Sequence, residues 1–409
     1  MKAVILAAGE GKRLRPFTFS RPKCMVSIAG KPLLHHLLLE AKKAGITEAV
    51  VVVKKMKDQV INYFNAYDLG MKITFVEQGE ETGTGAALLA AEDEINDTFV
   101  MLAGDTVTEA SVINKVIEAH RGRITLAVKK VPNPREYGVV EVSNGKVSMF
   151  EEKPHHPKSD LANLSVHCLE PTVFGELRSL SKSERGEHEL VDLFIGANAV
   201  EVDGYWRDIG YPWDMFEALG HLLSRMESKN GHIENSTVNG KVVMEKGAQV
   251  ISSYVEGNVY IGENSVVGPY AVLRGNNSVG KNCSVGGGTS LKNSILMDNV
   301  NAKHLAYIGD SILGNNINVG SGTQLANFRF DGSTVNCLTD KGWANSGRKK
   351  LGAFIGDNTK FGVNSCVMPG KLIGPDCWIY SGVVVNRNIP SSTRVYYRQQ
   401  LELGKFEED

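Results

Sequence analysis

A six-residue period in the second half of the chain constrains its fold more than any other feature. Large apolar residues recur at a strict spacing of six in two runs: Ile261, Val267, Leu273, Val279, Val285 and Leu291, then Ile355, Phe361, Val367, Ile373, Ile379 and Val385. Glycine directly follows several members of both runs. The period is neither 3.6 nor 2, so neither an amphipathic helix nor a plain strand explains it. It predicts a parallel β-helix, in which each repeat forms one flat side, aliphatic side chains fill the interior, and Gly or Asn forms the corners.

The two runs are separated by a stretch in which the period slips and a polar segment intervenes. The period partly recovers at Ile308, Leu313, Val319 and Leu325. Residues 326–354 are too long and too polar to be one more repeat. Such an excursion from a repeat array usually lies on the binding face. A tolerated surface insertion is the alternative reading.

The first half of the chain has a different pattern, since apolar runs of strand length alternate with amphipathic helical patterns. The apolar runs are residues 2–7, 48–53, 72–77, 98–105 and 124–129, and the helical patterns are residues 33–45, 58–67, 86–95 and 111–120. This alternation predicts a mostly parallel sheet covered by helices on both faces, with ligands outside the carboxyl ends of its strands. Residues 212–229 are predicted to form a helix that joins the two halves.

Composition narrows the functional classes. The 409 residues carry a formal net charge of -1, so there is no basic overall field of the kind that attracts nucleic acid. No run of 18 apolar residues is present, so we expect no membrane as a partner. The apolar amino terminus is too short for a signal sequence, and its basic cluster follows the apolar run, so it is read as a buried strand. Six cysteines lie far apart without CxxC spacing, which favours a cytoplasmic protein with reduced thiols.

A glycine-rich, basic segment follows the first predicted strand. It reads Gly9-Glu10-Gly11-Lys12-Arg13-Leu14 and is soon followed by Arg21-Pro22-Lys23. Glycines in a strand-to-helix turn let backbone N–H groups approach phosphates, and fixed cations offset polyphosphate charge. The segment is not a dinucleotide-binding fingerprint, because Leu14 replaces the third glycine, and it lacks the GxxxxGK[ST] of a P-loop.

Residues 6–32, LAAGEGKRLRPFTFSRPKCMVSIAGKP, resemble the signature of sugar-1-phosphate nucleotidylyltransferases. Gln78, Gly83-Thr84-Gly85, Gly104-Asp105, Tyr137-Gly138, Glu152-Lys153-Pro154, Asn163 and Trp206-Arg207-Asp208-Ile209-Gly210 agree with it. The resemblance implies attack of a sugar 1-phosphate oxygen on the α-phosphorus of a nucleoside triphosphate, with pyrophosphate leaving. The nucleophile is already an anion, so catalysis rests on positioning and charge stabilisation rather than on a general base.

The resemblance also implies a role for each matching residue. Arg13 and Lys23 are expected to be catalytic, and Asp105 and Asp208 to hold Mg²⁺. The implied nucleotide-binding residues are Leu6, Ala8, Gly9, Gly11, Gln78, Gly83 and Thr84. The implied sugar-phosphate-binding residues are Gly138, Glu152, Lys153 and Asn163. UTP and dTTP both stay open as substrates, because Asp208 resembles the thymidylyltransferase pattern whereas bacterial uridylyltransferases of this family have Asn there.

A second motif, Asn301-Ala302-Lys303-His304-Leu305-Ala306-Tyr307-Ile308-Gly309-Asp310, resembles the acetyltransferase motif of the bifunctional enzymes that make UDP-N-acetylglucosamine, including their archaeal type. Arg274 and Lys292 lie eighteen residues apart, and Asn318 and Asn327 follow His304 by fourteen and twenty-three residues, as in that family. The long insertion at 326–354 and the short carboxyl tail depart from the bacterial pattern. The family's hexapeptide helices are left-handed and carry their sites between the coils of a trimer, so a homotrimer or a dimer of trimers is expected.

Acetyl transfer to an amino sugar needs a neutral amine, and therefore a base with a pKa near 7. His304 is the candidate, since histidine is the side chain whose ordinary pKa is nearest. By resemblance Arg274 and Lys292 pair with the acceptor phosphate, Tyr307 and Asn318 orient the sugar, and Asn327 holds the amine. Lys349 and Lys350 on the insertion either contact acceptor or CoA phosphates or form a solvated charge run.

These expectations combine into one prediction. Residues 1–229 form an α/β Rossmann-like nucleotidylyltransferase domain, and residues 230–409 a left-handed parallel β-helix of hexapeptide repeats with acetyltransferase activity. The enzyme acetylates glucosamine 1-phosphate from acetyl-CoA and couples N-acetylglucosamine 1-phosphate with UTP. One alternative is a glucose-1-phosphate thymidylyl- or uridylyltransferase whose β-helix only assembles the oligomer. Another is a catalytically silent sensor of nucleotide sugars.

Overall fold

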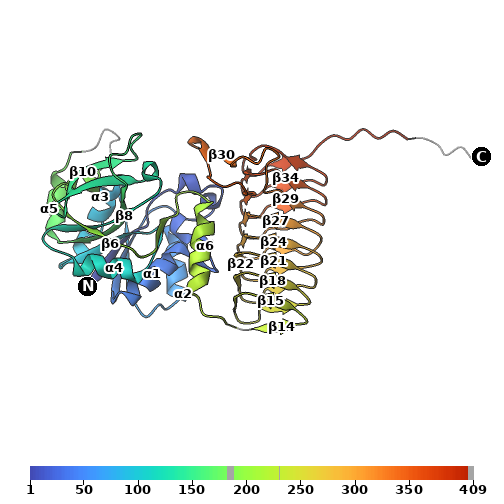
Figure 1. The fold of residues 1–409 in the computed structure, drawn as a ribbon, viewed down its shortest axis with the longest axis horizontal. Helices are drawn as coiled ribbons and strands as arrows, with labels where there is room; N and C mark the ends of the chain where they lie inside the picture. The colour runs from blue at the N-terminus through green and yellow to red at the C-terminus, as the bar shows by residue number, and fades with distance from the viewer. Residues whose placement is uncertain (182–187, 230, 404–409) are drawn as a thin grey trace, which may run out of the picture. The chain divides into compact units, whose positions relative to one another are not determined.

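The computed structural model describes residues 1–181, 188–229 and 231–403. Its chain forms two compact units, drawn in Figure 1. Unit 1 comprises Met1–Leu14 and Arg21–Ala218, and unit 2 comprises Arg15–Ser20 and the chain from Leu219 onward. None of the helices in the described ranges is long and apolar enough to cross a membrane.

Unit 1 is built around a nine-stranded sheet. In spatial order its strands are β5 (Lys72–Glu77), β4 (Glu48–Val53), β1 (Lys2–Leu6), β6 (Phe99–Ala103), β11 (Leu161–Leu169), β8 (Ile124–Lys130), β12 (Asn198–Glu201), β10 (Lys146–Glu152) and β9 (Gly138–Ser143). The first four are parallel, as the alternating sequence pattern predicts, and β12 is parallel to β8. β11 runs antiparallel to both β6 and β8, and β9 and β10 form an antiparallel pair.

Two short antiparallel pairs lie outside this sheet. They are β2 (Ser27–Ile28) with β3 (Lys31–Pro32), and β7 (Thr106–Thr108) with β13 (Trp206–Asp208). In the β7–β13 pair Asp208 stands opposite Thr106, next to Asp105 in the chain. The pair therefore brings a segment from the end of unit 1 to the carboxyl end of β6.

Helices cover both faces of the large sheet, because side chains alternate between its two faces. On one face Ala3 and Ile5 of β1 pack with α1 (Leu33–Lys43), α2 (Lys57–Ala66) and α4 (Ala110–Glu118). On the other face Val4 packs with α3 (Thr84–Leu89) and α5 (Thr172–Ser179). The 3-10 turns are η1 (Lys12–Leu14), η2 (Phe17–Phe19), η3 (Lys23–Met25), η4 (Glu92–Glu94), η5 (Pro134–Glu136) and η6 (Leu190–Leu193). The helix predicted within residues 212–229 is α6 (Asp214–Arg225).

Unit 2 is a coil whose successive sides form three parallel sheets (Figure 1). The first sheet contains β15 (Thr237–Asn239), β18 (Tyr254–Glu256), β21 (Val272–Arg274), β24 (Ser290–Lys292), β27 (Tyr307–Gly309), β29 (Gln324–Leu325), β34 (Cys366–Val367) and β37 (Val384–Val385). The second contains β16 (Val242–Met244), β19 (Val259–Ile261), β22 (Asn277–Val279), β25 (Ile295–Leu296), β28 (Ile312–Leu313), β32 (Phe354–Ile355) and β35 (Leu372–Ile373).

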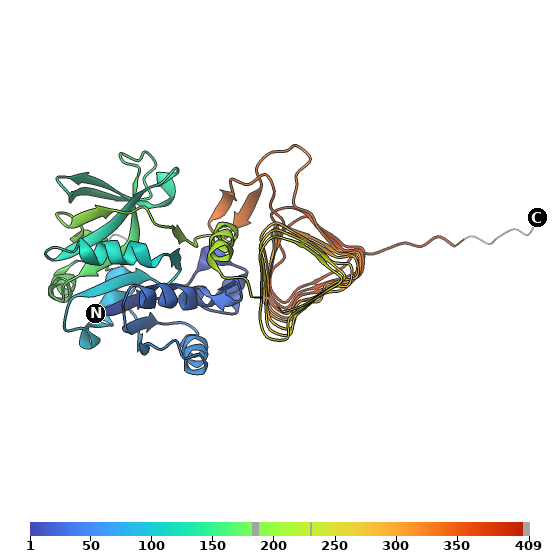
Figure 2. The same ribbon diagram turned by 60° about the horizontal axis from the view of Figure 1, so that its bottom comes forward.

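The third side begins with β14 (His232–Glu234), β17 (Gln249–Ile251), β20 (Val266–Val267), β23 (Ser284–Val285) and β26 (Asn301–Ala302). A bridge at Asn318 connects it to β33 (Lys360–Phe361), β36 (Trp378–Ile379) and β38 (Arg394–Val395). Figure 2 shows the triangular outline of the stacked turns. All members of the two six-residue runs lie in a single buried core inside the coil.

Asparagines occupy several corners of the coil with a positive φ, which Asn tolerates better than most residues. Asn282, Asn299 and Asn316 have φ of 53°, 60° and 59°. Their side chains bond in a ladder, because Asn282 Nδ2 donates to Asn299 Oδ1 at 3.3 Å and Asn299 Nδ2 to Asn316 Oδ1 at 2.9 Å. The corners are thus held by hydrogen bonds from one turn of the coil to the next.

The interruption at 326–354 has structure of its own. It contains an antiparallel hairpin of β30 (Asn336–Thr339) and β31 (Gly342–Asn345). The chain returns to the coil where Lys350 pairs with Phe328 in an antiparallel bridge and Leu351 N donates to Asn327 O at 2.9 Å. The insertion therefore brings its last residues back beside the point where it leaves.

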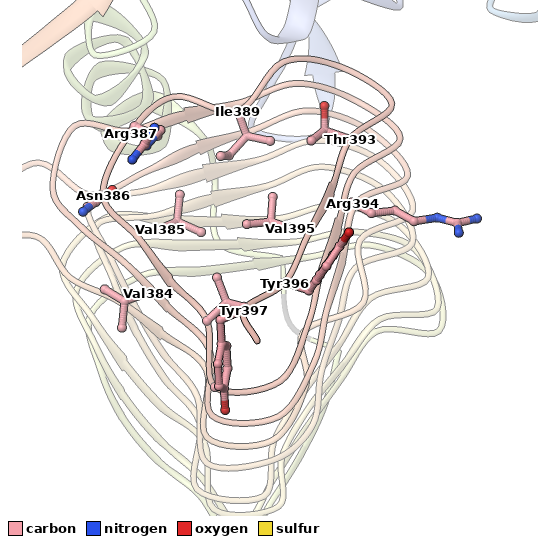
Figure 3. Close-up of a pocket in the computed structure, with 12 residues that line it drawn as sticks. Val384, Val385, Asn386, Arg387, Ile389, Thr393, Arg394, Val395, Tyr396 and Tyr397 are labelled. Carbon is pink, nitrogen blue, oxygen red and sulfur yellow. The ribbon is translucent and has the colours of Figure 1, made fainter. Parts of the chain in front are cut away.

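A hollow of about 770 Å³ opens at the carboxyl-terminal end of the coil. Figure 3 shows Val385, Ile389 and Val395 pointing toward the interior, whereas Arg394 points outward. The lining contains none of the site residues predicted from the sequence. This hollow is the open end of the coil's apolar core.

Candidate functional site

The predicted nucleotide and sugar residues of unit 1 share one edge of the large sheet. Because β1, β4, β5 and β6 are parallel, their carboxyl ends meet at this edge. β11 is antiparallel to β6, so its amino end lies at the same edge. Gln78 follows β5, the glycine segment follows β1, Asp105 follows β6, and Asn163 lies near the start of β11. The strand order therefore places the predicted base, phosphate, metal and sugar residues in that sequence along the edge.

The glycine segment lies open at the centre of this edge. Gly9 is exposed, and a Cβ built there would meet nothing within 4 Å. Gly11 has a φ of 66°, which favours glycine. Leu6 and Ala8 are half-buried, and the backbone of Leu6 accepts a hydrogen bond from Gly104 N at 2.9 Å. This contact ties the end of β1 to the turn that precedes Asp105.

Lys23 joins the two predicted metal ligands. Its Nζ pairs with Asp105 Oδ2 and lies 3.7 Å from Asp208 Oδ1. Burial alone would lower the pKa of Lys23, but the two carboxylates outweigh it, so the pKa is raised. Burial raises the pKa of Asp208, as does the charge of Asp105, while Lys23 opposes both. Two carboxyl groups and one ammonium thus share a half-buried polar cluster.

Arg13 lies beside this cluster. Its guanidinium lies over the Tyr211 ring, 5.3 Å from the centroid, and a Cβ on Gly210 would approach Arg13 Nη1 to 3.7 Å and Asp208 Oδ2 to 3.3 Å. Arg13, Lys23, Asp105 and Asp208, which are far apart in the sequence, are therefore brought together.

The predicted base-binding residues form a separate turn. Gln78 is buried, and its Nε2 donates to Glu81 O at 2.9 Å. Gly83 has a φ of 107°, and a Cβ there would collide with the carbonyl oxygen of His188. Thr84 is exposed, and its Oγ1 accepts from Leu190 N at 3.1 Å. One hydrogen-bonding group of Gln78 and one of Thr84 are thus used within the protein, where they shape the turn.

The predicted sugar residues lie on three neighbouring strands. Glu152 stands opposite Gly138 in the β9–β10 pair, and Ala162, next to Asn163, stands opposite Val139. Side chains larger than Gly at 138 would meet the Glu152 carboxylate at 2.9 Å. Lys153 has a φ of 48°, and its exposed Nζ lies 3.7 Å from Glu152 Oε1. Gly138, Glu152, Lys153 and Asn163 therefore gather at the same end of these strands.

A cluster of cations lies on the first sheet of the coil. Arg274 and Lys292 are directly adjacent in register on β21 and β24. Burial lowers the pKa of Lys292, and so do its contact with Lys350 and the charge of Arg274, while Asp310 opposes the shift. Crowding of like charges disfavours the charged form of Lys292, so an anion bound here would be stabilised. Lys350 belongs to this cluster. Lys349, which precedes it in the chain, is exposed.

Tyr307 and Asn327 meet next to this cation cluster. A Cβ on Gly309 would lie 2.6 Å from both Tyr307 Oη and Asn327 Nδ2, so glycine is required where these groups cross the strand. Asn327 Nδ2 donates to Asp310 Oδ2 at 2.6 Å, and Arg348 Nη2 lies 3.7 Å from Asp310 Oδ1. Asp310 is only 1% exposed. Its buried carboxylate anchors both the amide and the cation cluster.

His304 and Asn318 lie apart from this group. His304 is exposed at the corner between β26 and β27, and its carbonyl oxygen accepts from Gly322 N at 3.2 Å. Asn318 is exposed and pairs with Asn301 and Lys360 on the third side of the coil. Within one chain the predicted acetyl-transfer residues therefore form two groups, at the two ends of β27.

Sequence reasoning gave no role to Asp310, although the residue ends the quoted motif, and it did not single out His167. Asp310 becomes informative only when its burial and its bond to Asn327 are seen. His167 Nε2 comes within 2.8 Å of Asn163 Oδ1 because of an irregularity of β11 that no periodicity in the sequence indicates. The sequence also gave no sign that Lys23 contacts both aspartates.

Comparisons with known proteins agree with this arrangement. Residues 2–225 match the family model described as nucleotidyl transferase, and residues 255–341 match the GMPPB C-terminal domain. The chain is 38% identical to the bifunctional protein GlmU of Methanocaldococcus jannaschii over 99% of this chain and 100% of that protein.

The chain belongs to the bifunctional GlmU family.

A further member, the bifunctional sugar-1-phosphate nucleotidylyltransferase/acetyltransferase of Sulfurisphaera tokodaii, is 37% identical over 95% of this chain and 98% of its own length. Among solved structures, a putative glucose-1-phosphate thymidylyltransferase from Bacillus anthracis in complex with a sucrose is 27% identical with a TM-score of 0.51. The match covers 56% of this chain and 98% of the chain in that structure. The chain is thus a nucleotidyltransferase and acetyltransferase of the GlmU family, with a Rossmann-like amino-terminal part.

Proposed function

We propose that unit 1 couples N-acetylglucosamine 1-phosphate with UTP and releases pyrophosphate, and that unit 2 makes this sugar phosphate by acetylating glucosamine 1-phosphate from acetyl-CoA. The first assignment rests on one observation. The predicted base, phosphate, metal and sugar residues follow each other in that order along one sheet edge. A nucleoside triphosphate and a sugar phosphate laid along this edge would meet at Arg13 and Lys23.

In unit 1 a phosphate oxygen of the sugar phosphate attacks the α-phosphorus. The new O–P bond forms as the bond to the leaving pyrophosphate breaks, and no proton has to be removed from the nucleophile. Arg13 and Lys23 bring two anions together and stabilise the charge that develops on the phosphate oxygens. The exposed glycine turn lets backbone N–H groups approach the triphosphate.

Asp105 and Asp208 fit Mg²⁺. Both approach the same ammonium group, so their carboxylates converge on one point. The described chain contains no cluster of three or more His, Cys, Asp or Glu side chains that could hold a metal, which suits an ion that takes one or two carboxylates plus phosphate oxygens. Bound there, Mg²⁺ would supply charge neutralisation for the phosphates.

In unit 2 we infer a left-handed β-helix of hexapeptide repeats, supported by the three parallel sheets and the shared core of the six-residue runs. His304 takes a proton from the amine of glucosamine 1-phosphate. The amine nitrogen then bonds to the thioester carbonyl carbon as the carbon–sulfur bond breaks, and the proton held by His304 passes to the leaving sulfur, so CoA leaves as a thiol. Arg274, Lys292 and Lys350 hold the acceptor phosphate, while Tyr307, Asn318 and Asn327 orient the sugar and its amine.

The separation of these residues supports a site shared between copies. His304 precedes β27, whereas Lys292 of the cation cluster stands opposite Gly309 at its far end, so the two groups lie at opposite ends of one side of the coil. We therefore propose a homotrimer, or a dimer of trimers, in which His304 of one copy faces the cation cluster of another. Six free cysteines support a cytoplasmic enzyme with reduced thiols.

Asp105→Asn tests the assignment of unit 1. It removes a charge from the Lys23 cluster at nearly constant volume, so UTP-dependent pyrophosphate release should fall at least about a hundredfold while thiol release from acetyl-CoA is unchanged. Equal loss of both activities, or of neither, would contradict the assignment. Two further comparisons of pyrophosphate release by wild type rank the alternative substrates. One compares UTP with dTTP, and the other compares glucose 1-phosphate with N-acetylglucosamine 1-phosphate.

A further inference from the structure

A histidine and an asparagine four residues apart on β11 form a hydrogen bond that a regular strand could not make. His167 Nε2 lies 2.8 Å from Asn163 Oδ1. In regular extended chain, residues four apart are separated by about 13 Å. The pair is therefore the product of a local distortion of β11.

That distortion is visible in the register against β8. Asn163 stands opposite Val128 and His167 opposite Leu126, so four steps on β11 correspond to two on β8. Ser165, inside the irregularity, has a φ of 53°, a region that L side chains adopt at a cost. Bulges of this kind re-aim side chains and occur next to active sites. This unfavourable backbone conformation lies at the edge of the sheet where the predicted sugar-binding residues gather.

The hydrogen bonds fix which way the Asn163 amide faces. Ser165 N donates to Asn163 Oδ1 at 3.2 Å, and a backbone N–H can only donate. The amide atom on this side is therefore the oxygen. His167 must then donate as well, so its proton lies on Nε2 and Nδ1 is bare.

The surroundings of His167 hold it in that state. The side chain is 1% exposed and its ring meets Phe194 edge-on, with centroids 4.9 Å apart. Nδ1 is buried and has no hydrogen-bond partner in the described part of the chain, so only Nε2 is engaged. Burial lowers the pKa of His167 to about 3, so the imidazole is neutral at physiological pH. A donor of fixed tautomer thus faces Asn163.

We infer that His167 is a positioning residue that locks the Asn163 amide with its oxygen inward, so that its NH₂ group faces the sugar as a fixed hydrogen-bond donor. Asn163 is half-buried at the open edge of the sheet and can be reached by a ligand. The substrate atom it contacts must be an acceptor: a ring hydroxyl oxygen or the carbonyl oxygen of an acetamido group. This inference rests on the proposed function, because it takes Asn163 as a contact of the sugar 1-phosphate.

His167→Phe tests the inference in the full-length enzyme, since it keeps a ring beside Phe194 and removes the donor. KM for N-acetylglucosamine 1-phosphate should rise about three- to tenfold, the worth of one oriented hydrogen bond, while KM for UTP and thiol release by unit 2 stay unchanged. His167→Gln, whose Nε2 can donate from nearly the same place, should restore most of the affinity. Cys168→Ala, a buried neighbour on the opposite sheet face, is the matched control and should leave KM unchanged.

A double-mutant cycle with Asn163→Ala separates a positioning role from a packing role. If His167 acts through Asn163, adding His167→Phe to Asn163→Ala should raise KM no further. A rise limited to N-acetylglucosamine 1-phosphate would identify the acetamido carbonyl as the contact, and an equal rise with glucose 1-phosphate would identify a hydroxyl.

The possible failures are distinguishable. If Asn163→Ala leaves KM for both sugar phosphates unchanged, the proposed sugar contact is wrong, and the inference falls with it. If Asn163→Ala raises KM but His167→Phe does not, or if the two effects multiply, positioning is overturned while the proposed function stands. If His167→Phe raises KM for UTP as much as for the sugar and His167→Gln does not restore it, the histidine only packs.

Discussion

We predict that three buried histidines make the stability of unit 1 depend on pH. Burial lowers the pKa of His35 and His167 to about 3 and that of His36 to about 4. His36 Nε2 lies 2.8 Å from Ile28 O, and His35 Nδ1 lies 3.0 Å from Tyr63 Oη. Burial disfavours the charged ring in each case, although the hydrogen bond to the Ile28 carbonyl opposes the shift at His36.

The unfolded chain titrates its histidines near pH 6.5. Above that pH the histidines are neutral in both the folded and the unfolded state, so the free energy of unfolding is not reduced. As pH falls from about 6.5 toward 4, the unfolded state binds protons that the folded state does not, so the free energy of unfolding decreases. Each buried histidine should cost about 2 kcal/mol between pH 7 and pH 5. Urea unfolding of wild type and His167→Phe at both pH values measures this cost. The variant should lose about one such increment of pH dependence, and an equal pH dependence in the two proteins would contradict the prediction.

A second residue-scale prediction concerns the cation cluster on the coil. Lys292→Met and Lys350→Met each remove one charge from the predicted phosphate contact. KM for glucosamine 1-phosphate in thiol release should rise about tenfold in each, as expected for a charge-assisted hydrogen bond, with a weaker dependence on salt. Lys246→Met, an exposed lysine elsewhere on the coil, is the control. Variants that bind the acceptor like wild type would show that these lysines are only solvated charges.

At the scale of elements, the coil depends on its interior ladder of aliphatic side chains. Leu291 of β24 is fully buried between Leu273 of β21 and Ile308 of β27. Leu291→Ala leaves a cavity in a row that has neighbours above and below, so the free energy of unfolding of unit 2 should fall by about 2–5 kcal/mol. Val384→Ala, whose side chain is largely exposed on β37, should change it by less than about 0.5 kcal/mol. Equal denaturant midpoints for the two variants would contradict this account of the core.

The elements differ in how far sequence alone could predict them. The six-residue period indicates the coil interior directly, because each flat side of the coil points one aliphatic side chain inward. All members of the two runs, which include Leu273 and Ile373, lie in the core. The parallel strands from β1 to β6 were predictable for a similar reason, since a sheet covered on both faces needs continuous apolar strands. The hairpin at β30–β31 and the irregularity of β11 leave no periodic signal, because each depends on a single local backbone conformation and on its tertiary partners.

The site was predictable to the same limited extent. Residue types and spacing nominate Lys23, Asp105 and Asp208, but only the pairing of β7 with β13 brings Asp208 to the end of β6. Likewise Lys350 could be named from the sequence, yet its approach to Lys292 follows from the return of the insertion beside Phe328. Long-range contacts of this kind depend on register and loop path, which local sequence does not specify.

At the scale of the whole molecule, two chemistries are assigned to two units of one chain. The product of the acetyl transfer proposed for unit 2 is the sugar phosphate proposed as the substrate of unit 1. Each unit has its own core and its own cluster of charged residues, so a substitution in one site should leave the other reaction intact. The alternative, in which the coil only assembles the oligomer, predicts a single activity.

The most direct measurement of this claim is thiol release from acetyl-CoA on addition of glucosamine 1-phosphate, for wild type and His304→Ala side by side. Pyrophosphate release from UTP and N-acetylglucosamine 1-phosphate is followed in the same preparations. We predict thiol release by wild type, a loss of at least about a hundredfold in the variant, and equal pyrophosphate release by both. Absence of thiol release from wild type, with pyrophosphate still formed, would contradict the account and reduce the coil to a scaffold.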